Sequence, residues 1–249
     1  MTGEGRKQKI LEILNEDGNV NVSFLSRKFS VSEVTIRKDL ADMEFKGLLT
    51  RTHGGAVGSY KPYYSLSLNQ RMATNQAAKR IIAEKISLRI ENNDTLMLNS
   101  GTTTLLIFRA LPLNLSLNII TNSVAIAFEG AGNPNYNIIL IGGFVNEKYQ
   151  FTYGDDAVKQ LKNYHADKAI LSVDGIDSDN GYSTYYDREA EIDRIMLVQS
   201  DIKIIAADFS KFHKTAFARI ADINAADHIV TNKNPRLDIK DPLFKKMLI

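Results

Sequence analysis

The N-terminal part of the chain carries short helical stripes of apolar residues separated by breaks. Apolar side chains share one helical stripe over residues 6–15, which predicts a helix, and Gly18 interrupts the pattern. Leu25 and Phe29 are four residues apart, which predicts a short second helix with Ser23 as its N-cap. The pattern therefore predicts two short helices at the start of the chain.

A third helix is predicted to begin after Ser32, whose hydroxyl can accept a hydrogen bond from a backbone N–H of the first turn. Ile36, Leu40 and Met43 recur at i, i+4 and i+7 and form one apolar face. Val31 is expected to be the buried residue of the turn before this helix. The stretch alone is equally compatible with an ordinary amphipathic surface helix. The polar and basic residues that fall off the apolar face are Thr35, Arg37 and Lys38.

The residues after the third helix predict a short hairpin. Gly47 ends the helix, and residues 48–51 and 56–57 are short extended segments around a glycine-rich tip. Two helices, a turn, a third helix and a hairpin predict a winged helix-turn-helix over residues 1–57. In that arrangement the third helix enters the major groove and the wing reaches the DNA backbone. We predict DNA contacts from Ser32, Thr35, Arg37, Lys38, Arg51 and His53.

The remainder of the chain alternates between strand-like and helical stretches. Residues 58–75 are predicted to form a linker and entry segment, of which residues 58–62 are irregular and polar. Residues 76–249 are predicted to form a larger α/β domain, with a mostly parallel sheet covered by helices on both faces. The expected strands are 95–98, 117–120, 137–141, 168–173, 203–207 and 228–231, the last in the chain, and the expected helices are 76–90, 102–111, 123–129, 155–163 and 188–198.

The expected strands of this domain end in polar residues. In a parallel sheet, ligands bind beyond the carboxyl ends of the strands. Gly101 permits close backbone approach, and three threonines at the following helix start direct N–H groups and hydroxyls to one point, which suits a phosphate. The alternative is a helix start whose hydroxyls satisfy only their own backbone. We predict one polar pocket formed by Ser100, Gly101, Thr102, Thr103, Thr104, Asn122, Ser123, Gly142, Gly143, Asp174, Gly175 and Lys211.

Several of these stretches resemble the DeoR family of bacterial transcription regulators. Residues 31–40 and 46–56 match the DNA-binding domain of the family in spacing and residue type, with Lys38 where the family usually has arginine. The polar loops resemble its effector domain, with departures at 172–173 and at Tyr182. The resemblance implies operator DNA, a phosphorylated sugar or sugar-like effector, and an effector domain related in fold to ribose-5-phosphate isomerase. The loops that match are 100–104, 121–123, 142–143, 174–176 and 208–212.

Composition limits the other classes of function. The net charge is only +2, from 31 basic and 29 acidic residues, which argues against an architectural DNA-binding protein. Cysteine is absent, and no apolar run approaches a membrane span, which fits a cytoplasmic protein without membrane partners. The sequence contains neither of the glycine-rich motifs G-x-x-x-x-G-K-S/T and G-x-G-x-x-G that bind nucleotides. No cofactor or metal is predicted. The four histidines lack metal-ligand spacing and lie at His53, His165, His213 and His228.

These observations predict a sequence-specific transcriptional regulator, a repressor of a sugar-metabolism operon, rather than an enzyme. Dimers read two-fold operators, so we expect a homodimer or homotetramer held together by the larger domain. The alternative is a sugar-phosphate isomerase with an appended DNA-binding head. In that case Asp174, Asp177 and Lys211 would carry out acid–base chemistry.

Overall fold

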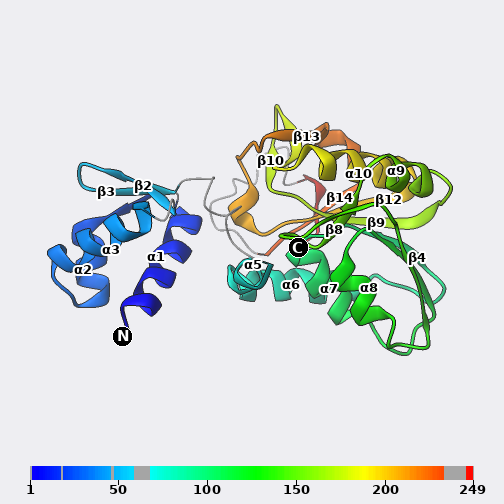
Figure 1. The fold of residues 1–249 in the computed structure, drawn as a ribbon, viewed down its shortest axis with the longest axis horizontal. Helices are drawn as coiled ribbons and strands as arrows, with labels where there is room; N and C mark the ends of the chain where they lie inside the picture. Colours follow the sequence, from blue (N-terminus) through cyan, green and yellow to red (C-terminus); the bar gives the residue numbers. More distant parts are fainter. Residues whose placement is uncertain (1, 18, 46–47, 59–67, 233–244, 249) are drawn as a thin grey trace. The chain divides into compact units, whose positions relative to one another are not determined.

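The computed structural model describes residues 2–17, 19–45, 48–58, 68–232 and 245–248 (Figure 1). The chain divides into two compact units, Met1–Thr74 and Asn75–Ile249. None of the helices in the described ranges is both long and apolar enough to cross a membrane.

The first unit contains three helices and a three-stranded antiparallel sheet. Its helices are α1 (Gly3–Asp17), α2 (Val22–Phe29) and α3 (Glu33–Phe45), and its strands β1 (Asn19–Asn21), β2 (Leu49–Thr52) and β3 (Gly55–Gly58) pair in the order β1-β3-β2. The predicted helix-turn-helix and wing hairpin are confirmed, and β1 adds a strand beside the wing. The core residues are Ile10, Ile13, Leu14, Val20, Val22, Leu25, Ile36, Leu40, Met43, Leu49 and Ala56.

The cap of α2 differs from the prediction. Asn21, at the end of β1, accepts hydrogen bonds from the backbone N–H groups of Ser23 and Phe24 at 2.9 and 3.4 Å. Because the helix already begins at Val22, Ser23 lies inside it, and the predicted Ser23 cap is wrong. Val31, in the turn that follows, is only half-buried. The predicted helix stop at Gly47 lies outside the described residues.

Helix α3 is positioned by a cap and by a buried ion pair. The Ser32 hydroxyl accepts a hydrogen bond from the Thr35 N–H at 3.2 Å, so the predicted N-cap is confirmed. The Arg6 guanidinium on α1 donates to the Asp39 carboxylate on α3 at 2.6 Å, and both side chains are buried. Removal of one partner would leave an uncompensated buried charge, so this pair holds α3 against α1.

The second unit is built on a seven-stranded sheet in which every neighbouring pair is parallel. The predicted parallel sheet is therefore confirmed. The expectation that residues 228–231 form the last strand is wrong, because a two-residue strand follows and is too short to show a sequence pattern. In spatial order the strands are β15 (Met247–Leu248), β14 (His228–Val230), β12 (Ser200–Ala206), β9 (Ala166–Ser172), β4 (Thr95–Leu98), β5 (Leu117–Thr121) and β6 (Tyr136–Leu140).

Helices cover both faces of this sheet (Figure 1). Met97 packs in one core cluster with Leu161 and Met196, which come from α9 and α10. Successive strand residues point to opposite faces, so the buried side chains of Leu96 and Leu98 belong to the other face. The two groups of helices in Figure 1 are α6 (Gln76–Ser87), α7 (Thr102–Ala110) and α8 (Val124–Gly130), and α9 (Asp155–Leu161) and α10 (Asp187–Val198).

The sequence pattern missed the shortest elements. Helix α5 (Leu68–Ala73) lies in the predicted linker 58–75, where the sequence analysis expected no helix. The other short elements span too few residues to show a period of 2 or 3.6. They are the hairpin β7 (Phe144–Asn146) and β8 (Phe151–Tyr153), the antiparallel strands β10 (Gly175–Asp177), β11 (Gly181–Thr184) and β13 (Ala218–Ala221), and the 3₁₀ turns η1 (Phe209–Lys211) and η2 (Ile223–Ala225).

The order of the strands defines where a ligand would bind. From β4 the chain moves outward through β5 to β6, and β9 then pairs on the opposite side of β4. The topological switch point therefore lies between β4 and β9. Ligands of open parallel sheets bind in the crevice at such a point, beyond the carboxyl ends of the strands.

Candidate functional site

The exposed face of α3 carries two of the predicted DNA contacts. Arg37 and Lys38 are exposed, and the Arg37 guanidinium lies 3.6 Å from the Glu33 carboxylate one turn earlier. The Thr35 hydroxyl lies 2.9 Å from the hydroxyl of Ser32, so these two predicted residues also serve the helix cap. Both cations are available to DNA, whereas Thr35 must exchange a hydrogen bond within the protein for one to a base.

The wing is tied to the end of α3. The Arg51 backbone N–H donates to the Glu44 carboxylate at 2.8 Å, and the Arg51 guanidinium lies 3.8 Å from the same carboxylate. His53 is exposed at the tip of the hairpin. Glu44 therefore sets the position of the strand that carries Arg51 relative to α3. Sequence reasoning did not identify Glu44, because it is seven residues from Arg51 and shares no helical face with it.

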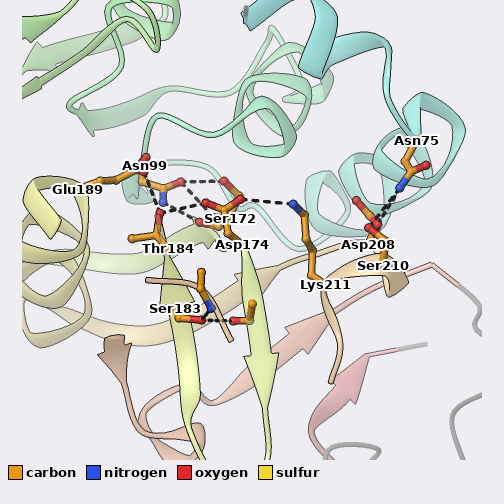
Figure 2. Close-up of polar contacts among 12 residues, drawn as sticks. Asn75, Asn99, Ser172, Asp174, Ser183, Thr184, Glu189, Asp208, Ser210 and Lys211 are labelled. Atoms are coloured by element: carbon orange, nitrogen blue, oxygen red, sulfur yellow. Dashed lines mark hydrogen bonds and ion pairs between the residues drawn. The ribbon is translucent and has the colours of Figure 1, made fainter. Parts of the chain in front are cut away.

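Asn99 occupies the switch point between β4 and β9 (Figure 2). Its fully buried amide donates to the Ser172 carbonyl at 2.9 Å and accepts from the Ser172 N–H at 3.0 Å. A Cβ on Gly101 would lie 1.5 Å from the Ser172 hydroxyl. The close approach that glycine permits is thus made by Ser172, and not by a ligand as we predicted for Gly101.

The three threonines at the start of α7 do not share one role. The Thr104 hydroxyl lies 2.9 Å from the carbonyl of Asn99 and 2.7 Å from that of Gly101, so it satisfies its own loop. Thr102 and Thr103 are also buried, but neither hydroxyl bonds to a residue in the described ranges. The helix start has no side-chain capping bond. Two hydroxyls and the first N–H groups of α7 are therefore available to an anion.

Hydrogen bonds connect the predicted residues Ser100, Asp174 and Lys211. The connection runs through Glu189 and Thr184, which were not predicted (Figure 2). The Ser100 hydroxyl donates to the Glu189 carboxylate at 2.7 Å. The Thr184 hydroxyl lies 3.0 Å from that carboxylate and 3.1 Å from the Asp174 carboxylate, which accepts from Lys211 Nζ at 3.3 Å. Glu189 and Thr184 come from α10 and β11. Neither is at the end of an expected strand, and the one available signal was the acidic first turn of α10.

Asp193 lies one helical turn beyond Glu189 and is fully buried. Its Oδ1 accepts from the Asn99 amide at 3.0 Å, while its Oδ2 has no hydrogen-bond partner in the described part of the chain. Burial, and then the nearby Glu189 charge, raise the pKa of the Asp193 carboxyl well above its usual range. The neutral acid is therefore favoured, which limits the negative charge at the base of this network.

The residues that follow β12 make contacts in two different directions (Figure 2). Asp208 accepts from the Ser210 N–H at 3.0 Å, which forms the η1 turn. The Asn75 amide donates to Asp208 at 3.1 Å and to the Ser210 hydroxyl at 3.3 Å. Lys211, in the same turn, pairs instead with Asp174. Of this segment, Lys211 alone joins the network that contains Ser100.

Four further predicted residues, Asn122, Ser123, Gly142 and Gly143, follow the ends of β5 and β6. Asn122 is fully buried, and its Oδ1 has no partner among the residues that the structure describes. The Ser123 hydroxyl caps α8 by accepting from the Ile126 N–H at 3.3 Å. Gly143 has a φ of +136°, and a Cβ there would lie 2.4 Å from the Tyr153 carbonyl. The helix cap accounts for serine at position 123, and the backbone conformation accounts for glycine at position 143. Asn122 Oδ1 can still accept a hydrogen bond from a ligand.

A pocket of about 510 Å³ adjoins the last of these four residues. Gly143 is the one predicted effector residue in the wall of this pocket, so the pocket is distinct from the start of α7 and from the network around Ser100. Gly142 donates its N–H to Gln160 at 3.0 Å, and Gly175 pairs with Ser183 in the β10–β11 hairpin. The pocket is lined by Gly143, Phe144, Tyr153, Gly154, Asp155, Asp156, Lys159 and Arg188.

The two departures from the family pattern have different positions. Ser172 lies at the switch point, against Gly101. Tyr182 is fully buried in the core, and its hydroxyl donates to the Ile223 carbonyl at 3.0 Å. Burial raises the pKa of the Tyr182 hydroxyl. Only the Ser172 departure therefore touches the candidate site.

Comparison with known proteins connects this geometry to a family. The family models described as DeoR-like helix-turn-helix domain and DeoR C terminal sensor domain match residues 6–60 and 74–233. The uncharacterized HTH-type transcriptional regulator YulB of Bacillus subtilis (strain 168) is 35% identical over 91% of this chain and 88% of its own length. The glycerol-3-phosphate regulon repressor of Escherichia coli (strain K12) is 30% identical over 96% and 94%.

A solved ribose 5-phosphate isomerase of Methanocaldococcus jannaschii shares 15% identity over 56% of this chain and 55% of that chain, with a TM-score of 0.41. This likeness is too low to support an argument about activity. The matched relatives are regulators, which supports the regulator prediction over the isomerase alternative. The chain belongs to the DeoR family of DNA-binding transcriptional regulators.

Proposed function

We propose that this regulator represses a sugar-metabolism operon and that a phosphorylated sugar or sugar-like metabolite controls its affinity for operator DNA. The observation that carries the proposal is the start of α7, beside the switch point. Thr102 and Thr103 are buried there with hydroxyls that bond to no described residue. Neither oxygen is among the fully buried side-chain atoms that lack a hydrogen-bond partner, so both hydroxyls reach solvent and fit a site whose ligand supplies the acceptors.

The groups around the start of α7 suit two different parts of a sugar phosphate, the phosphate and the sugar. Backbone N–H groups at the positive end of a helix favour a phosphate. The Asp174 and Glu189 carboxylates, joined through Thr184, are suited to accept hydrogen bonds from sugar hydroxyls. Lys211 balances the charge of Asp174. We assign the phosphate to the α7 start and the sugar to this carboxylate network, with Asn122 as a further polar contact.

The first unit is proposed to bind the operator DNA whose affinity the ligand controls. Arg37 and Lys38 on α3, with Arg51 and His53 on the wing, are proposed to contact operator DNA. A single small head offers few contacts, so we propose a homodimer or homotetramer that reads a two-fold operator in the bacterial cytoplasm. For the ligand to regulate binding, it must prefer one arrangement of the assembly over the other.

A thermal-shift screen of sugar phosphates against the full chain tests the ligand assignment. A ligand at about 100 times its Kd adds roughly 2.7 kcal/mol of stability. Thr103→Val preserves shape and removes one donor, so it should cost the phosphorylated ligand about 1–3 kcal/mol and leave ligand-free stability and operator affinity unchanged. The unphosphorylated sugar should bind both proteins poorly.

Thr104→Val is the matched control, because the Thr104 hydroxyl bonds within its own loop. It should lower the stability of the ligand-free protein by about 1–3 kcal/mol. If Thr103→Val leaves the ligand response of operator binding intact, the α7 start is only a helix cap and the effector binds elsewhere.

A further inference from the structure

The outward face of α3 has an apolar side chain in its first turn. Val34 is 75% exposed, although the neighbouring turn of the same helix buries Ile36 completely. At 100° per residue, Lys38, Ala41 and Phe45 lie along the same outward line of the helix as Val34. This face is therefore not the purely polar and basic surface that the sequence predicts.

The fold does not require valine at this position. Val34 is absent from the core cluster of the first unit, and a β-branched residue is a weak helix former. Its polar neighbours have partners within the helix, since Arg37 pairs with Glu33 and Thr35 with Ser32. Val34 is thus the exposed side chain in the first two turns of α3 that has no polar group.

We propose that Val34 is a specificity-determining residue that reads a thymine of the operator by packing against its C5-methyl group. The residues near the N-terminus of a recognition helix contact base edges in the major groove. The thymine methyl is the apolar group that the major groove displays, and apolar side chains recognise it by contact. Val34 occupies the second residue of α3 and faces outward, so it is placed for this contact.

The other exposed large apolar residue on the outward line provides the control. Phe45 is 91% exposed and ends α3, eleven residues after Val34. At 1.5 Å per residue, this separates the two Cα atoms by about 16 Å. A contact made by the first turn of α3 should therefore be independent of Phe45.

The experiment uses the full chain and an operator selected by the wild-type protein from a random DNA duplex library. Each thymine of that operator is replaced, one at a time, by deoxyuridine, which lacks only the methyl group. At one thymine per half-site we expect the replacement to weaken wild-type binding about fourfold, the value for loss of one buried methyl. The same replacement should change the binding of Val34→Ala by less than twofold.

Phe45→Ala should keep the wild-type uracil profile. Val34→Ser, a second variant without the apolar surface, should behave as Val34→Ala does. Because Val34 is exposed, both variants should unfold at the wild-type temperature. Identical uracil profiles for wild type and both Val34 variants would overturn the proposal, as would a wild-type profile without any sensitive thymine.

Discussion

The two units present their candidate functional residues in opposite ways. In the first unit these residues, apart from the half-buried Thr35, are exposed and lie on or beside one helix and one hairpin, and Arg37 pairs with Glu33 only four residues away. In the second unit most of them are buried or half-buried and come from several strand ends, and Ser100 pairs with Glu189, which is 89 positions away along the chain. Exposed residues can be replaced without disturbing the fold, whereas buried ones support both the site and the core.

The largest expected effect follows from the buried network. Asn99→Ala should destabilise the protein by about 3–5 kcal/mol, because it leaves the Ser172 backbone and the Asp193 carboxyl without their buried partner. Urea unfolding measures the loss. Arg37→Ala, on the exposed face of α3, is the control and should change stability by no more than about 0.5 kcal/mol. A loss below about 1 kcal/mol for Asn99→Ala would contradict the contrast between the units.

An intermediate effect is expected on DNA binding. Arg37→Ala should weaken operator binding by about 1–3 kcal/mol and relax specificity at one base pair, because an arginine reads a guanine edge with two hydrogen bonds. Arg51→Ala should weaken binding to all sequences alike and reduce the salt slope by about 1, as expected for a phosphate contact. Binding to a panel of operator variants at several salt concentrations measures both. If Arg37→Ala discriminates between the operator variants as the wild type does, Arg37 does not contact a base.

The smallest effect is a trend with pH in the second unit. The raised pKa of Asp193 means that the folded state resists ionisation, so stability falls as pH rises from about 3.8 through the folded pKa. Asp193→Asn mimics the neutral acid and keeps the bond from Asn99. Its stability relative to wild type should therefore increase with pH, measured by thermal unfolding between pH 4 and pH 8.

Asp177 serves as the matched control with the opposite sign. Backbone hydrogen bonding from Asn180 lowers the pKa of the Asp177 carboxyl, so its contribution is present above pH 3.8 and is lost as pH falls through the folded pKa. Asp177→Asn should therefore lose stability relative to wild type as pH rises. The same slope for both variants would show that net charge, and not the local environment, sets the trend.

The sequence by itself determined the features that depend on neighbours within about four residues. The buried face of α3 follows from Ile36, Leu40 and Met43, and the cap follows from Ser32. The parallel sheet follows from the alternation of apolar strands with helices. These features repeat with the geometry of one element, so a pattern along the chain is sufficient to predict them. The exposure of Arg37 and Lys38 follows in the same way.

Only the tertiary structure decided how the polar loops are used. Three adjacent threonines read alike in the sequence, yet Thr104 bonds within its loop, while Thr102 and Thr103 do not. Gly101 accommodates Ser172, and Glu189 reaches Ser100 from α10. The partner of a buried polar group is set by which strands become neighbours in the sheet. That choice depends on the packing of the whole unit, and no local pattern in the chain records it.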